Sequence, residues 1–151
     1  MKWLLDTNVI SEPMRNRPHR NVVDWIAAET LANIAISVVT LSELLDGVAT
    51  DRDETRRRQL STWVEIEVAD RFRERTLPLT TDILIDWLRL GRRLRAKGRG
   101  PDAADLLIAA TARVHQLTVV TRNIRDFADT GLIVYDPWTG ETHRMDAPDA
   151  R

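Results

Sequence analysis

Three acidic residues stand where the pattern of the sequence changes. Asp6 ends the first apolar run, Glu43 lies four residues after the second, at 33–39, and Asp105 lies in the first turn of the apolar stretch 102–115. In open α/β sheets, functional sites form beyond the carboxyl ends of the strands. We therefore expect these three carboxylates to converge at one edge of a sheet.

Carboxylates gathered in this way need a counter-charge. Three of them about 5 Å apart repel one another by roughly 3 kcal/mol per pair at an effective dielectric constant of 20. Mg²⁺ relieves this repulsion, because it binds a few carboxylates and keeps several waters. Such a cation generates a hydroxide nucleophile and neutralises charge on a phosphodiester. The chain has no cysteine, and its histidines, His19, His115 and His143, have no metal-site spacing, which also favours Mg²⁺ or Mn²⁺.

Helix capping is the alternative interpretation of each acid. Thr40 and Glu43 have the spacing of a capping box, in which Glu43 only holds a helix start. Asp102 opens the apolar stretch, where the helix dipole favours an acid, and Asp6 and Asp126 could each cap a short helix or turn. Taken singly, each acid is explained at least as well by capping. Taken together, their mutual repulsion favours a metal site.

Length and composition describe one globular domain. The chain has 151 residues, of which 43% are hydrophobic and 30% charged. No apolar run approaches the roughly 18 residues that a membrane span requires. The N-terminus lacks the charged leader and apolar segment of a signal peptide, so we expect a cytoplasmic protein without a membrane partner.

Arginine dominates the basic residues, supplying 20 of 22. The stretch 89–99 holds six basic residues and no acid. Arginine grips phosphate with two hydrogen bonds, and a local basic cluster can hold nucleic acid although the net charge is −1. Taken alone, the stretch is better explained as a solvated helix face.

Strands and helices alternate along the chain. We expect strands at 2–6, 33–39, 76–80, 117–121 and 132–135, with 76–80 at a sheet edge because Pro78 cannot donate to a ladder. We expect helices at 9–12, 21–29, 40–49, 82–97 and 102–115. A further helix starts in or after the polar segment 50–58 and continues through Trp63 to about Ala69. This order predicts an α/β fold with a mostly parallel sheet. The polar segment after Trp138 is expected to be frayed.

Four blocks of this sequence, in this order, resemble a PIN domain. They are Leu-Leu-Asp-Thr-Asn-Val-Ile-Ser at 4–11, Ser-Val-Val-Thr-Leu-Ser-Glu-Leu at 37–44, Asp-Leu-Leu-Ile-Ala-Ala-Thr-Ala at 105–112 and Val-Thr-Arg-Asn-Ile-Arg-Asp-Phe at 120–127. Tyr-Asp-Pro-Trp at 135–138 is similar to the usual ending of the family. Within that class the sequence resembles the VapC and FitB toxin ribonucleases. The resemblance covers about residues 2–138.

The resemblance implies a PIN-like three-layer α/β/α sandwich over residues 1–138, with a polar C-terminal tail at 139–151. It also implies a Mg²⁺- or Mn²⁺-dependent ribonuclease with Asp6, Glu43 and Asp105 as its acidic core. The fourth acidic position of the family falls on Asn123 here, so Asp126, Asp102 or a water takes its place. The hydroxyls of Thr7 and Thr121 are candidates for the water shell, and equally for caps.

Substrate and partners follow from the same resemblance. RNA phosphates are expected to contact the arginines at six positions: Arg92, Arg93, Arg95, Arg99, Arg122 and Arg125. The resemblance to VapC toxins implies a homodimer and a small antitoxin of the VapB or FitA kind that covers the acidic groove. Such an antitoxin could inhibit by placing one of its arginines among the carboxylates. Trp63 and Trp87 fit such an interface, and fit a core position equally well.

Other functions of α/β proteins are less consistent with these residues. A phosphoaspartate receiver needs a lysine after a late strand, and the only lysines are Lys2 and Lys97. A haloacid-dehalogenase phosphatase needs an aspartate at the position of Asn8, and a dinucleotide-binding fold needs a glycine-rich turn after the first strand. The remaining alternative is a catalytically weak RNA-binding or partner-binding module on the same fold.

Overall fold

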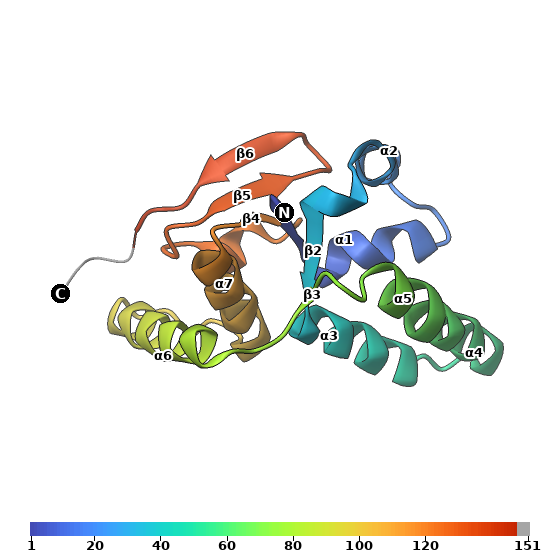
Figure 1. The fold of residues 1–151 in the computed structure, drawn as a ribbon, viewed down its shortest axis with the longest axis horizontal. Coiled ribbons are helices and arrows are strands. Elements are labelled where there is room, and N and C mark those ends of the chain that lie inside the picture. Colours follow the sequence, from blue (N-terminus) through green and yellow to red (C-terminus); the bar gives the residue numbers. More distant parts are fainter. Residues whose placement is uncertain (148–151) are drawn as a thin grey trace.

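A single sheet forms the centre of the protein. The computed structural model describes residues 1–147, and within them six strands are ordered β3-β2-β1-β4-β5-β6 (Figure 1). The strands are β1 Trp3–Leu5, β2 Ile34–Ser37, β3 Thr76–Leu77, β4 Thr118–Val120, β5 Ile133–Asp136 and β6 Glu141–Arg144. β1 to β5 pair in parallel, and β6 is antiparallel to β5. The predicted mostly parallel sheet is therefore confirmed, with β3 at an edge.

Helices cover both faces of this sheet. They are α1 Thr7–Ser11, α2 Arg20–Ala28, α3 Val38–Ala49, α4 Glu54–Thr62, α5 Ala69–Arg71, α6 Thr81–Ala96 and α7 Ala103–His115. Short 3-10 helices lie at η1 Glu12–Met14, η2 Leu31–Asn33 and η4 Ile124–Phe127, and α4 continues into a π-helix, η3 Trp63–Val68. In Figure 1 the sheet separates α6 and α7, on the left, from α1, α2, α4 and α5, on the right.

Neighbouring residues of one strand belong to opposite cores. Leu4 and Val119 pack in the core beneath α6 and α7, whereas Leu5 and Val120 pack in the core beneath α1, α3 and η3. Side chains alternate between the two faces of a strand, so a sheet covered on both faces needs continuous apolar runs. This explains why the strands of the sequence read as unbroken apolar segments and confirms the three-layer architecture.

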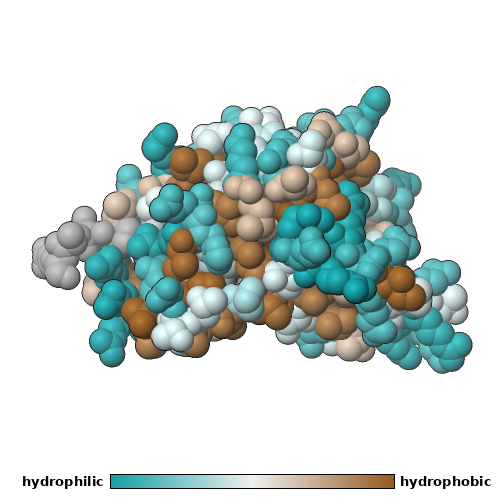
Figure 2. Space-filling model, in the orientation of Figure 1, coloured by the Kyte–Doolittle hydropathy of each residue, from teal (hydrophilic) through white to brown (hydrophobic). Residues whose placement is uncertain are grey.

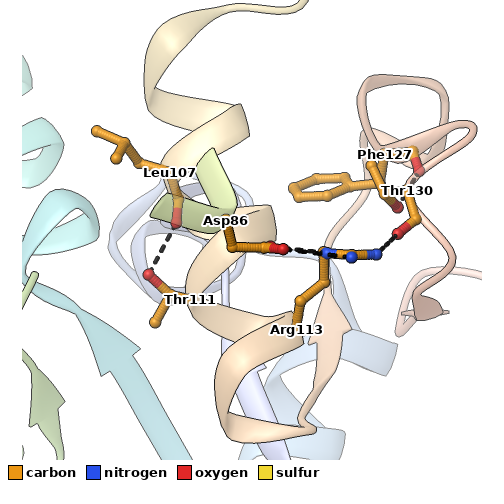
Figure 3. Close-up of polar contacts among 6 residues, drawn as sticks. All are labelled: Asp86, Leu107, Thr111, Arg113, Phe127 and Thr130. Atoms are coloured by element: carbon orange, nitrogen blue, oxygen red, sulfur yellow. Dashed lines mark hydrogen bonds and ion pairs between the residues drawn. The ribbon is translucent and has the colours of Figure 1, made fainter. Parts of the chain in front are cut away.

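The two helices on one face are joined by a partly buried polar contact. Arg113 of α7 donates from Nε to Asp86 Oδ2 of α6 at 2.8 Å, and from Nη1 to the carbonyl oxygen of Thr130 at 2.5 Å (Figure 3). Gly91 permits the helices to approach, because a Cβ there would lie 3.0 Å from Leu106 Cδ2. The ion pair therefore joins α6, α7 and the loop before β5.

Three expectations from the sequence need correction or refinement. The segment after Trp138 is not frayed throughout, because Glu141–Arg144 forms β6; residues 148–151 of the expected tail lie outside the described residues. Helix α3 begins at Val38, two residues earlier than expected, so β2 is correspondingly shorter. Trp63 and Trp87 are partly buried and pack against the two cores, which supports the core interpretation of both.

No helix within residues 1–147 combines the length and the apolar character that crossing a membrane requires.

Candidate active site

Asp6 is held at the carboxyl end of β1 by four hydrogen bonds. Its backbone N–H donates to the carbonyl oxygen of Val120, and its Oδ1 accepts the N–H of Thr7 at 2.8 Å, which caps α1. Its Oδ2 accepts from Thr121 Oγ1 at 2.7 Å and from Asn8 Nδ2 at 3.1 Å. Burial raises the pKa of Asp6, although these hydrogen bonds oppose the rise. The capping interpretation of Asp6 is confirmed, but it explains only one of its two oxygens.

Glu43 faces Asp6 from α3. Thr7 Oγ1 donates to Glu43 Oε1 at 3.1 Å, so Thr7 contacts one acid through its backbone and the other through its side chain. The capping-box interpretation of Glu43 is wrong, because Ser37 caps α3 and Thr40 donates to the carbonyl oxygen of Leu5. Burial raises the pKa of Glu43, and the charges of the neighbouring acids add to the rise.

Besides burial, the charges of four neighbouring carboxylates raise the pKa of Asp105, more than act on Asp6 or Glu43. It lies in the first turn of α7, after Asp102, whose Oδ1 accepts the N–H of Ala104 at 2.9 Å and caps the helix. Burial, followed by the charges of four neighbouring carboxylates, raises the pKa of Asp105 to about 7. These four are Asp6, Asp126, Asp102 and Glu43. We call these five residues the acidic cluster.

Asp126 and Asn123 contribute to this site in different ways. Asp126 lies inside η4 rather than at its N-cap, so the capping interpretation of Asp126 is wrong. Its charge instead raises the pKa of both Asp6 and Asp105. Asn123 is exposed, and its backbone N–H donates to Thr121 Oγ1 at 3.0 Å. The structure thus brings all six predicted site positions to the same end of the sheet.

Asn8 is a member of the site that the sequence interpretation missed. Its Nδ2 donates to Asp6 Oδ2 and to Thr121 Oγ1, at 3.1 Å each, and its Oδ1 accepts the N–H of Arg122 at 3.2 Å. The sequence suggested only a turn or cap at this position. The signal that could have found it is its spacing, two residues after an acid that ends a buried strand.

The predicted RNA-contacting arginines separate into three groups. Arg92, Arg93 and Arg95 are exposed on the C-terminal half of α6. Arg99 forms an ion pair with Asp129, and Arg99 and Arg125 line one pocket together with Asp126. These last two arginines therefore stand beside the acidic cluster.

Arg122 forms the third group. Its Cζ lies 5.5 Å from the centroid of the Trp138 ring. Its N–H contacts Asn8, which in turn contacts Asp6.

An apolar hollow adjoins Glu43. Residues of α1, α3, α4 and η3 line it, among them Thr7, Glu43, Val48, Leu60 and Trp63. The hollow joins the acidic cluster to an apolar surface, which suits an elongated ligand with both a charged and an apolar part.

Metal binding at this site is judged from the donors. Within residues 1–147, no three carboxylate or imidazole side chains are placed so that they could hold a metal ion. The donors that the acidic cluster offers are all oxygens, which Mg²⁺ and Mn²⁺ prefer. Burial, followed by the charges of the neighbouring acids, raises the pKa of Asp105, and a divalent cation would relieve the repulsion among these acids. The donor atoms therefore match such a cation in kind, whereas the positions of the side chains within residues 1–147 do not form a ready coordination site.

Comparison with known proteins agrees with this geometry. The family model described as "PIN domain" matches residues 3–132. The chain belongs to the PIN-domain family. This PIN domain is 36% identical over 135 residues to Toxin FitB of Neisseria gonorrhoeae, covering 89% of this chain and 97% of that protein. It is 35% identical to the VapC ribonuclease Y4jK of Sinorhizobium fredii, covering 89% and 96%. It is thus a PIN-domain toxin of the VapC and FitB type.

Solved structures of high similarity include members of toxin–antitoxin systems. The crystal structure of FitAcB from Neisseria gonorrhoeae is 35% identical and has a TM-score of 0.85, covering 90% of this chain and 98% of that one. A toxin–antitoxin complex from Klebsiella pneumoniae is 26% identical and has a TM-score of 0.60, covering 84% and 91%. These similarities confirm the PIN-like fold expected from the sequence.

Proposed function

We propose that this PIN domain is a metal-dependent endoribonuclease and the toxin of a type II toxin–antitoxin pair. The observation that carries the proposal is the convergence of five carboxylates around Asp105, whose pKa is raised to about 7 by burial first and by the charges of the other four second. Five like charges gathered without a cation repel one another and lower the stability of the fold. The similarity to a protein named as a VapC ribonuclease supports RNA as the substrate.

The acids have distinct roles in this proposal. Asp6 and Asp105 would hold Mg²⁺ or Mn²⁺ directly or through water, while Glu43 would position a water or a second ion. The bound cation supplies a water of lowered pKa and neutralises charge on the phosphodiester. Thr7 and Thr121 orient Glu43 and Asp6 through the hydrogen bonds already described. The hydroxyl of Thr7 donates to Glu43 Oε1, and no donor within residues 1–147 contacts Oε2, which would accept a proton from water.

The arginines beside the acidic cluster are proposed to hold RNA. Arg99 and Arg125 line a pocket next to Asp126, so they are placed to contact phosphates adjacent to the one that is cut. Arg122 is connected to Asp6 through Asn8. Arg92, Arg93 and Arg95 extend the basic surface along exposed positions of α6. Phosphate contacts of this kind make binding sensitive to salt.

A small antitoxin is the proposed protein partner. The apolar hollow beside Glu43 suits the apolar face of a short segment, and the acidic cluster suits an arginine at its end. A guanidinium forms strong paired hydrogen bonds with carboxylates, so it would compete with the metal for the same oxygens. An antitoxin of the VapB or FitA kind that inserts an arginine there would inhibit the enzyme.

A homodimer is proposed from the apolar surface of α6 and α3. Leu84, Ile85 and Leu88 on α6 are 41% to 50% exposed, and Val38 and Leu45 on α3 are 38% and 39% exposed. Figure 2 shows hydrophobic residues along the lower edge of the molecule, where Figure 1 places these two helices. Apolar surface of this kind is typical of an interface.

Cleavage of RNA by the purified protein tests the enzymatic part. We expect cleavage with Mg²⁺ or Mn²⁺, none with EDTA, and a loss of about a hundredfold or more in Asp6→Asn. Asp24→Asn is a matched control, because Asp24 is an exposed acid of α2 that pairs only with Arg20. Binding of RNA without cleavage under any of these conditions would favour the alternative, a catalytically weak RNA-binding or partner-binding module.

Expression in cells tests the toxin part separately. We expect growth arrest when the chain is expressed alone and normal growth when the small protein encoded beside it is expressed too. A chain that is harmless alone and forms no complex with that protein would contradict the toxin assignment, even if RNA cleavage is observed.

A further inference from the structure

Arg122 and Trp138 form a pair at the rim of the acidic cluster. The guanidinium lies over the indole, with 5.5 Å between Arg122 Cζ and the ring centroid, which is within the range of a cation–π contact. Arg122 is exposed and Trp138 is partly exposed. None of the ion pairs formed within residues 1–147 involves Arg122. The indole is thus the neighbour of the guanidinium, and no carboxylate within residues 1–147 forms an ion pair with Arg122.

Both partners are fixed through their backbones. The N–H of Arg122 donates to Asn8 Oδ1 at 3.2 Å, and Asn8 donates to Asp6. The N–H of Trp138 donates to Asp136 Oδ1 at 2.8 Å, and its carbonyl oxygen accepts from Asn21 Nδ2 at 2.9 Å. The backbones that carry the pair are therefore fixed before any ligand arrives, which reduces the entropy lost on binding.

Packing against the core accounts for only one side of Trp138. The indole packs against the core beneath α1, α3 and η3, and its exposed side meets an exposed arginine in the turn after β5. A second cation over an indole among the described residues, Lys2 over Trp3 at 4.2 Å, lies at the amino end of β1, opposite the acidic cluster. Only the Arg122 pair is connected to Asp6 by hydrogen bonds.

We propose that Arg122 and Trp138 form a stacking subsite for one base of single-stranded RNA, next to the phosphodiester that the acidic cluster receives. Planar guanidinium and indole groups are the side chains on which unpaired RNA bases stack. A base suits this position because both the guanidinium and the indole are planar groups, and the guanidinium N–H groups remain available to the adjoining phosphate. The proposal rests on the proposed ribonuclease function and adds to it a subsite that reads a base.

Abasic RNA separates stacking from phosphate contact. The probe is a fluorescein-labelled single-stranded octaribonucleotide of mixed sequence, bound in EDTA at low salt so that it is not cut. A matched series carries one abasic nucleotide at each position in turn, which removes a base and keeps every phosphate. We expect one abasic position to weaken binding to the unmodified protein by about tenfold, as measured by fluorescence anisotropy.

Substitutions at the pair complete the test. Trp138→Leu and Arg122→Gln should each weaken binding of the intact probe by about tenfold, and Trp138→Phe, which keeps a ring, by much less. In Trp138→Leu the sensitive abasic position should bring no further loss, because the base stacks on the guanidinium that the indole supports and the two effects are therefore coupled. Lys2→Ala is the matched control and should bind as the unmodified protein does. Arg122→Gln, at an exposed position, keeps the test valid if Trp138→Leu fails to fold.

Three results would overturn the inference. The first is unchanged RNA affinity in both Arg122→Gln and Trp138→Leu together with equal losses at all abasic positions. The second is unchanged RNA affinity combined with weaker capture of the small antitoxin, which would assign the pair to a protein interface. The third is an abasic loss of equal size in Trp138→Leu and in the unmodified protein. A failure of the unmodified protein to bind any probe would instead contradict the proposed ribonuclease function on which the inference rests.

Discussion

The hydroxyl of Thr121 donates to Asp6 Oδ2 at 2.7 Å, across 115 residues of sequence. This bond joins the carboxyl ends of β1 and β4 at the point where the acidic cluster forms. The same hydroxyl accepts from Asn8 Nδ2 and from the N–H of Asn123, so one small side chain serves three neighbours. A hydroxyl side chain suits this position because its oxygen both donates and accepts.

Thr121→Val should therefore reduce activity without unfolding the protein. Valine has the shape of threonine but cannot orient Asp6, and the loss of this hydrogen bond should raise the pKa of Asp6 further. We expect RNA cleavage to fall by about tenfold to a hundredfold and the free energy of unfolding to fall by about 1 to 2 kcal/mol. Thr118→Val, at the start of the same strand, is the control. Equal cleavage by both variants would contradict the positioning role.

Asp105→Asn should stabilise the metal-free protein at neutral and alkaline pH. The pKa of Asp105 rises from 3.8 to about 7 on folding, so between these values the folded protein keeps a proton that the unfolded chain has released. The free energy of unfolding consequently falls as the pH rises through this window. Asparagine does not titrate, so it removes that loss of stability. The gain at pH 8 is about 1 to 2 kcal/mol, smaller than the full pKa shift implies, because solvent screens a half-buried carboxylate.

Thermal unfolding in EDTA measures this effect. The melting temperature of Asp105→Asn should exceed that of the unmodified protein at pH 8, and the two should converge toward pH 4. A variant that is less stable at pH 8, or a difference that does not depend on pH, would show that Asp105 is not destabilised by its neighbours.

Metal affinity should depend on the same proton. A cation and a proton compete for Asp105, so affinity should fall as the pH drops below about 7. Calorimetric titration of Mn²⁺ should show binding about tenfold weaker at pH 6 than at pH 8. Asp105→Asn should bind Mn²⁺ much more weakly, and Asp82→Asn, an exposed acid in the first turn of α6, should bind it normally. Equal binding by Asp105→Asn and the unmodified protein would remove Asp105 from the metal site.

The sequence was sufficient to predict that the acids converge. It was insufficient to predict the residues that form hydrogen bonds with them. Asp6 and Asp105 follow from apolar runs whose ends are fixed by burial on both sheet faces, so their convergence could be predicted. Asn8 contacts Thr121, which is 113 residues away, and that pairing leaves no local pattern. Asp86 and Arg113 are 27 residues apart on different helices, and their ion pair was missed for the same reason.

Strand β6 was missed because its composition lacks the strand signal. Glu141, Thr142 and Arg144 are exposed and His143 is only partly buried, so the segment shows no apolar alternation. Its pairing with β5 follows from the tight turn 137–140, in which Gly140 has φ of 79°. Backbone hydrogen bonds to an existing strand thus formed a strand that the side chains did not predict.

Charge reversal should distinguish the two arginines of the pocket beside Asp126. Arg99 is paired with Asp129, whereas Arg125 lines the same pocket without an ion pair among the described residues. Arg125→Glu should therefore weaken RNA binding more than Arg99→Glu does and should reduce the slope of log affinity against log salt by about one or more. Arg58→Glu, on exposed α4, is the control. Equal affinity and slope in Arg125→Glu and the control would exclude this pocket from RNA binding.

Asp86→Asn should destabilise the protein while leaving the chemistry of the site intact. The Asp86 carboxylate receives two hydrogen bonds from Arg113, at 2.8 Å and 3.3 Å, and both side chains are about three-quarters covered. Removing the negative charge leaves a half-buried guanidinium with only the Thr130 carbonyl oxygen as a partner (Figure 3), at a cost of about 1 to 3 kcal/mol. Urea unfolding should show this loss, whereas Asp82→Asn, one turn earlier and exposed, should be neutral. RNA cleavage per folded molecule at low temperature should remain unchanged in Asp86→Asn. The reason is that the ion pair acts on the packing of α6 against α7 and not on the acidic cluster. A drop in cleavage with no change in the free energy of unfolding would contradict this role.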